Sequence, residues 1–110
     1  MTTTPNFWDR ISEELRTASE KARKEAERAV RSGVLQMDLV SLRRDRGRAQ
    51  ARVGARVLSL WKDEKLESLT DDPETLRLMG TVQSIEGLIA AKEQELRSIR
   101  TRTPDEAHTQ

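Results

Sequence analysis

Six carboxylates between residues 63 and 74 form the densest group of residues that could do chemistry in this sequence. They are Asp63, Glu64, Glu67, Asp71, Asp72 and Glu74. Carboxylate oxygens are the ligands that Ca²⁺ prefers, but these residues do not follow the Asp-x-Asp-x-Asp-Gly spacing of a calcium loop. Acids also stabilise the N-terminus of a helix, where they meet the positive end of its dipole. We therefore expect these acids to mark a helix start, and we predict no metal site.

Catalysis by a nucleophile and a base is not indicated either. His108 is the single histidine, and it lies beyond Pro104 in a segment that we expect to be a tail. A catalytic base must be held in a fixed geometry, which a tail does not provide. The chain has no cysteine and no glycine-rich phosphate-binding loop. The sequence therefore predicts a protein that is not an enzyme and takes no cofactor and no small-molecule substrate.

Four arginines are spaced to share one face of a helix, because they recur every four residues. They are Arg44, Arg48, Arg52 and Arg56. Such a stripe could contact the phosphates of nucleic acid or of an anionic membrane. The favoured interpretation is a solvated face, neutralised by the acid-rich half of the chain that follows. No aromatic residue lies between the arginines, so base stacking is not available there.

The composition indicates what kind of element positions these groups. Of the 110 residues, 35% are charged, 35% are hydrophobic and 3% are aromatic, and the net charge is +1. High charge with periodic Leu, Ile, Val and Ala is typical of long helices that share narrow seams. The net charge gives no general drive toward nucleic acid or membrane. No cysteine, no apolar run of about 18 residues and no signal peptide are visible, which favours a cytoplasmic protein.

Two heptad seams predict an antiparallel helical hairpin over residues 34–100, with a turn at about 63–72. The first seam comprises Leu35, Leu39, Leu42, Arg46, Ala49, Val53, Val57 and Leu60. The second comprises Leu78, Val82, Ile85, Ile89, Lys92, Leu96 and Ile99. Apolar residues in alternating steps of three and four form such a seam. Asp72 is the expected N-cap of the second helix, and Pro73 its first residue.

The numbering of the seams suggests a register in which Leu42 lies opposite Leu96 and Leu39 opposite Ile99. Arg46 and Lys92 then face each other in a polar layer, where two unpaired cations cannot be buried. Both side chains could extend to the solvent along the flanks, an acid could come in, or the layer could stay wet. The candidate acids are Glu14, Glu25, Asp45, Glu93 and Glu95. A single polar layer of this kind typically fixes the register of a coiled coil.

An additional amphipathic helix is predicted over residues 6–32, between a disordered start at 1–5 and the hairpin; residues 101–110 form the tail. Ser32-Gly33 is the break signal between the two helical segments. A glycine there could end the first helix, which would then fold back as a three-helix bundle. It could also be tolerated within one long, kinked helix. Both alternatives give an elongated all-α protein.

Two surfaces are candidates for contact with a partner. The first is the N-terminal patch of Phe7, Trp8, Ile11 and Leu15. It could pack in the core against Val53, Val57 and Trp61, enter a partner's groove, or lie on a membrane surface. The second is a stripe of small residues opposite the second seam, comprising Gly80, Ser84, Gly87, Ala91, Gln94 and Ser98. These are either tolerated surface residues or the site where another helix approaches, from this chain or another protomer.

The order of these segments, with "VGARVLSLW", then "DDPE", then "LRLMGTVQSIEGLIAAKEQEL", resembles the helical part of small bacterial proteins that often carry a C-terminal zinc ribbon. The resemblance covers most of residues 7–100. It implies a helical fold and no particular reaction. This chain has no cysteine and ends in TRTPDEAHTQ, so we expect no such ribbon.

Together these observations predict a non-enzymatic helical module for interaction or assembly. We expect it to bind a protein partner or to form a homo-oligomer through its helix faces. The alternative is a peripheral binder of anionic surfaces, membrane or nucleic acid, through the N-terminal helix or the four arginines.

Overall fold

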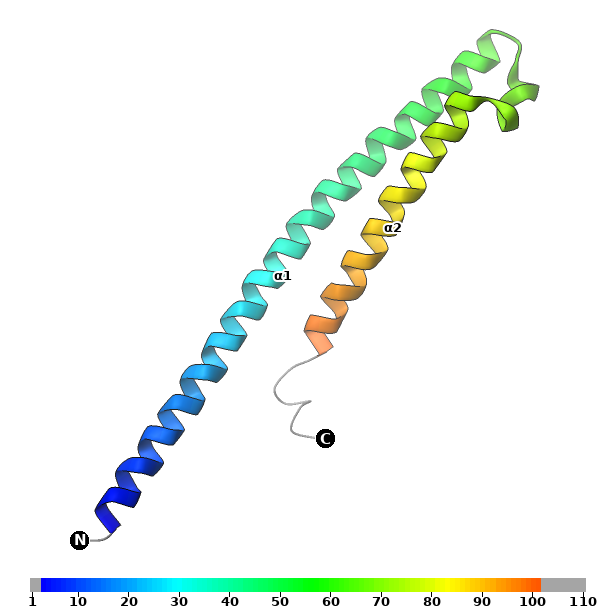
Figure 1. The fold of residues 1–110 in the computed structure, drawn as a ribbon. Coiled ribbons are helices and arrows are strands. Elements are labelled where there is room, and N and C mark those ends of the chain that lie inside the picture. The colour runs from blue at the N-terminus through cyan, green and yellow to red at the C-terminus, as the bar shows by residue number, and fades with distance from the viewer. Residues whose placement is uncertain (1–2, 102–110) are drawn as a thin grey trace. The chain divides into compact units, whose positions relative to one another are not determined.

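The computed structural model describes residues 3–101, with side chains from Phe7 onward. In this range the chain forms a long helix α1 (Thr3–Lys62), a short 3₁₀ helix η1 (Leu66–Asp71) and a second long helix α2 (Pro73–Thr101), and it contains no strand (Figure 1). The predicted all-α helical hairpin is confirmed. The connection between α1 and α2 occupies residues 63–72, the range predicted for the turn. The expected tail, including His108, lies almost entirely outside the described residues.

The chain divides into two compact units, residues 1–34 and residues 35–110. The first unit contains the N-terminal part of α1. The second contains the rest of α1 together with η1 and α2, which returns antiparallel to α1 (Figure 1). The hairpin is therefore formed by the second unit alone.

The core of the hairpin is the pair of predicted seams. The buried apolar residues of this unit are Leu35, Leu39, Ala49, Leu60, Leu78, Val82, Ile89 and Leu96. Every one of them occupies a predicted seam position. Four of them, Leu35, Leu39, Ile89 and Leu96, form one cluster, against which three further seam residues pack. The heptad pattern thus identified the buried faces of both helices correctly.

The burial of Leu35 indicates a register about one helical turn from the predicted one. Leu35 is only 4% exposed. In the predicted register its partner would be residue 103, beyond the end of α2 at Thr101. A shift of one turn would bring Leu35 level with Ile99 and Leu39 level with Leu96, and all four residues belong to the core cluster or pack against it. The same shift brings Leu60 level with Thr75, which is buried.

Backbone hydrogen bonds define the turn between the helices. The N–H of Lys65 donates to the carbonyl of Leu60 at 2.8 Å, and the N–H of Glu64 donates to the carbonyl of Trp61 at 3.1 Å. Glu64 has a φ of 59°, in the left-handed region where a helix commonly ends. These bonds satisfy carbonyls in the last turn of α1 and direct the chain into η1.

The N-terminal part of α1 continues through Ser32 and Gly33 without interruption. The alternative in which the first helix folds back at this point is therefore wrong. One helical glycine costs only about 1 kcal/mol relative to alanine. The surrounding Ala, Glu, Lys and Arg residues are strong helix formers, and they offset this cost. The helix also begins earlier than predicted, because Thr3–Pro5 are helical rather than disordered.

Candidate interaction surfaces

The N-terminal patch is exposed. Phe7 is 57% exposed, Trp8 is 60% exposed and Leu15 is 64% exposed, while Ile11 is half-buried. The Phe7 and Trp8 rings meet edge to face, with centroids 5.6 Å apart. Its three interpretations, core packing, a partner's groove and a membrane surface, all stay predictions.

An apolar stripe continues from the N-terminal patch along the same unit of α1. Its members recur at helical spacing, and we call them the N-terminal apolar stripe: Ile11, Leu15, Ala18, Ala22, Ala26 and Ala29. All except Ile11 are exposed, as are the neighbouring Val30 and Val34. A helix with one apolar face normally buries that face against another element. Within its own unit this face is exposed.

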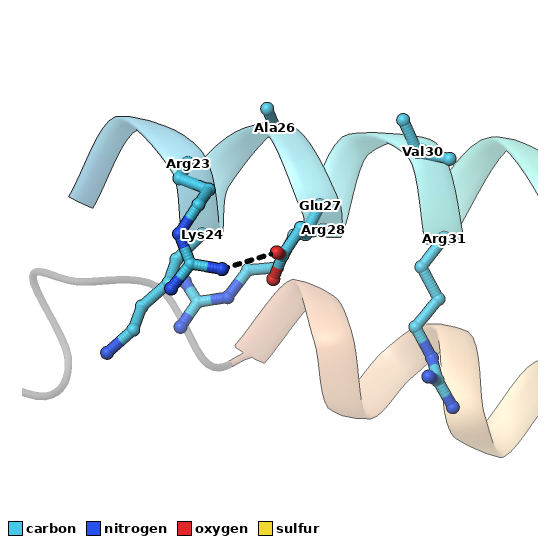
Figure 2. Close-up of a pocket in the computed structure, with 7 residues that line it drawn as sticks. All are labelled: Arg23, Lys24, Ala26, Glu27, Arg28, Val30 and Arg31. Carbon is cyan, nitrogen blue, oxygen red and sulfur yellow. Dashed lines mark hydrogen bonds and ion pairs between the residues drawn. The ribbon is translucent and has the colours of Figure 1, made fainter. Parts of the chain in front are cut away.

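Charged side chains occupy the other side of this unit. Figure 2 shows Lys24, Arg28 and Arg31 extending to one side of α1, while Ala26 and Val30 point to the other. The guanidinium of Arg23 donates to Glu27 at 2.8 Å. These residues line an open hollow of about 600 Å³ on the helix surface, which lacks the walls of a small-molecule site. The unit therefore presents distinct charged and apolar sides.

The four arginines do not form a uniform cationic stripe. Arg56 makes two hydrogen bonds to Asp72, with its Nε 2.9 Å from Oδ2 and its Nη2 2.7 Å from Oδ1. Arg48 lies 3.7 Å from the Asp45 carboxylate. Arg44 and Arg52 are exposed. Two of the four predicted phosphate contacts thus already have a carboxylate partner within the hairpin.

Asp72 joins the arginine face of α1 to the start of α2. Its Oδ2 accepts from the backbone N–H of Thr75 at 2.9 Å and from the Thr75 hydroxyl at 2.7 Å. This confirms the predicted N-cap. The hydrogen bond from Arg56, then that from Thr75, lowers the pKa of Asp72 far below its usual range, and Asp72 in turn raises the pKa of Arg56. The sequence analysis missed Arg56 as a partner because the two residues are far apart in the chain.

The other described acids of the turn do not join Asp72 in a metal-binding cluster. Glu74 forms an ion pair with Arg77 at 2.7 Å, and this hydrogen bond lowers the pKa of Glu74. Glu64 and Glu67 are exposed on the turn. Across residues 3–101 no cluster of three or more His, Asp or Glu side chains is arranged to hold a metal ion. The structure brings together one carboxylate, one guanidinium and one hydroxyl, which is the arrangement of a helix cap.

The predicted polar layer is built differently from the expected Arg46–Lys92 pair. Both residues are half-buried on the seam, but Lys92 Nζ lies 3.4 Å from Asp38 Oδ2 on α1. Asp38 precedes Arg46 by eight residues, or about 12 Å along a helix axis. Lys92 therefore forms an ion pair with an acid, which is the second of the three alternatives predicted for this layer. Asp38 was not among the candidate acids, because the predicted register placed it too far away.

The small-residue stripe on α2 is open. Gly80, Ser84, Gly87 and Ala91 are all exposed. A Cβ added at Gly80 or Gly87 would meet no atom within 4 Å beyond its own helical turn. Cover of this stripe by another helix, from this chain's first unit or from another protomer, stays a prediction.

No protein-family model, curated protein or solved structure matches this chain. The resemblance to the helical part of the zinc-ribbon proteins accordingly stays a prediction. Between Thr3 and Thr101, neither long helix contains an apolar segment sufficient to cross a bilayer.

Proposed function

We propose that this protein is a non-enzymatic helical module that binds protein partners, or a second copy of itself, through exposed faces of α1. The observation that carries this proposal is the uncovered apolar side of residues 7–34. Five large hydrophobic residues of this unit, Phe7, Trp8, Leu15, Val30 and Val34, are each more than half exposed. Contiguous exposed apolar surface of this kind marks interaction sites on soluble proteins.

The character of these residues supports a protein partner. Phe7 and Trp8 are large, rigid side chains of the type that anchors protein interfaces. Helical spacing from Ile11 to Ala29 provides a continuous face for another helix. The hairpin, in contrast, buries its own seams in an internally packed core.

Binding to an anionic membrane or nucleic acid is the alternative. Exposed Arg44 and Arg52, and the cationic side shown in Figure 2, favour it. The carboxylate partners of Arg48 and Arg56 weaken it, because paired charges release fewer counterions from a phosphate surface. We therefore place protein binding first.

The test is affinity capture from a lysate of the native host treated with nuclease and detergent. The bait is the full chain, compared with the variant Phe7→Ser, Trp8→Ser, Ile11→Ser. A matched control, Val40→Ser with Met37→Ser, removes exposed apolar groups from the hairpin unit instead. We expect a specific protein, or tagged copies of this chain itself, to be retained by the wild type and the control and lost by the triple variant.

Co-sedimentation with anionic vesicles and with RNA at two salt concentrations completes this experiment. Pelleting that is strong at low salt, lost at high salt and lost in Arg44→Ala with Arg52→Ala would replace protein binding with the anionic-surface function. Capture of no protein and no copy of the chain would contradict the proposal directly.

A further inference from the structure

We draw no further inference here: the strongest candidate, the hollow between the two helices of the hairpin lined by Leu39, Val40 and Leu96 together with Arg43, Arg97 and Arg100, is an unpartnered groove, and nothing in the structure shows what covers it.

Discussion

At the scale of single residues, Asp72 connects local and tertiary structure. One carboxylate caps α2 through Thr75 and holds α1 through two hydrogen bonds from Arg56. The cap could be predicted from the sequence, because Asp before Pro at a helix start is a local signal. The ion pair could not, because it depends on how the turn returns the chain to α1. The tip of the hairpin is therefore fixed by an ion pair between α1 and the start of α2 as well as by the helix cap.

Asp72→Asn should lower the thermal stability of the hairpin by several degrees at pH 7. Asn caps a helix about as well as Asp, so this change removes mainly the charge that binds Arg56. Because the folded pKa of Asp72 is lowered, its contribution to stability is present above the unfolded pKa of about 4 and is lost as the pH falls below it. The difference in melting temperature between wild type and variant should therefore shrink between pH 5 and pH 2.

Thermal melts by circular dichroism at several pH values measure this difference. Glu67→Gln, which removes an exposed carboxylate from the same turn, should leave the melting temperature nearly unchanged. A constant difference between wild type and Asp72→Asn across the pH range would show that the Arg56 pair contributes nothing through its charge.

Leu39→Ala should destabilise the hairpin by about 2–5 kcal/mol, the usual cost of removing a buried leucine. Leu39 is 3% exposed, and its neighbour Val40 is 55% exposed, so Val40→Ala is a matched control expected to cost about 0.5 kcal/mol or less. Urea unfolding of both variants provides the comparison. Equal losses would mean that the seam assignment is wrong.

At the scale of elements, the sequence predicts both buried faces but not how they are aligned. Every buried apolar residue of the hairpin lies on a predicted seam. A slide of one turn keeps apolar residues opposite apolar residues, so the pattern alone does not choose between registers. The length of the turn and specific ion pairs make the choice, including Lys92 with Asp38 and Arg43 with Glu93 at 3.2 Å. Such pairs join residues about 50 positions apart, so they cannot be predicted from spacing along the sequence.

For the candidate contact residues too, the sequence predicts which residues form a surface but not how that surface is used. Phe7, Trp8 and Ile11 were identified as a patch from their types and spacing, yet core packing ranked first among its interpretations. That ranking assumed a chain reversal at Ser32-Gly33. Helix propensity on both sides of Gly33 favours continuation, and α1 runs through it. Whether the helix that carries this patch continues past residue 33 thus depended on how one glycine, Gly33, is accommodated.

Arg46→Leu with Lys92→Leu should raise the thermal stability of the hairpin while loosening its specificity. Both side chains are half-buried on the seam, and the Lys92–Asp38 pair is partly exposed, so the pair itself is worth about 0–1 kcal/mol. Leucine at both positions makes the seam continuous, and a uniform seam tolerates sliding. We expect a higher melting temperature and more than one species in analytical ultracentrifugation. A fall of several degrees would identify the layer as a structural ion site.

Gly80→Ala with Gly87→Ala should stabilise α2 by about 1–2 kcal/mol in total, since alanine is the better helix former and nothing obstructs either Cβ. Denaturant unfolding measures the gain. The bulkier pair Gly80→Leu with Gly87→Leu tests cover by another protomer, because it should change the sedimentation of the protein only if a second helix lies on this stripe. A raised melting temperature with unchanged sedimentation would make these residues ordinary surface.

At the scale of the whole molecule, the helices of the two units are stabilised by different interactions. Residues 35–101 are stabilised by burial of two seams against each other, which is the main source of helical stability in proteins. The first unit is a single helical segment and forms no such pair of seams within itself. Its helix depends on intrinsic propensity and on local ion pairs such as Arg16–Glu13 at 2.7 Å, each worth a few tenths of a kcal/mol. A helix with this support alone is marginal in water.

Hydrogen exchange should therefore divide at the boundary between the units. Amides of residues 35–60 and 75–99 should be strongly protected, because exchange there requires the hairpin to unfold, whereas amides of residues 7–34 should exchange through local fraying. If the N-terminal apolar stripe binds a second copy, protection of residues 15–34 should rise as protein concentration passes the dissociation constant, because association stabilises the bound state by mass action. Protection in the hairpin should not change. Strong, concentration-independent protection of residues 7–34 would mean that this helix is stable without any partner, and the physical case for an interaction module would then rest on its exposed apolar residues alone.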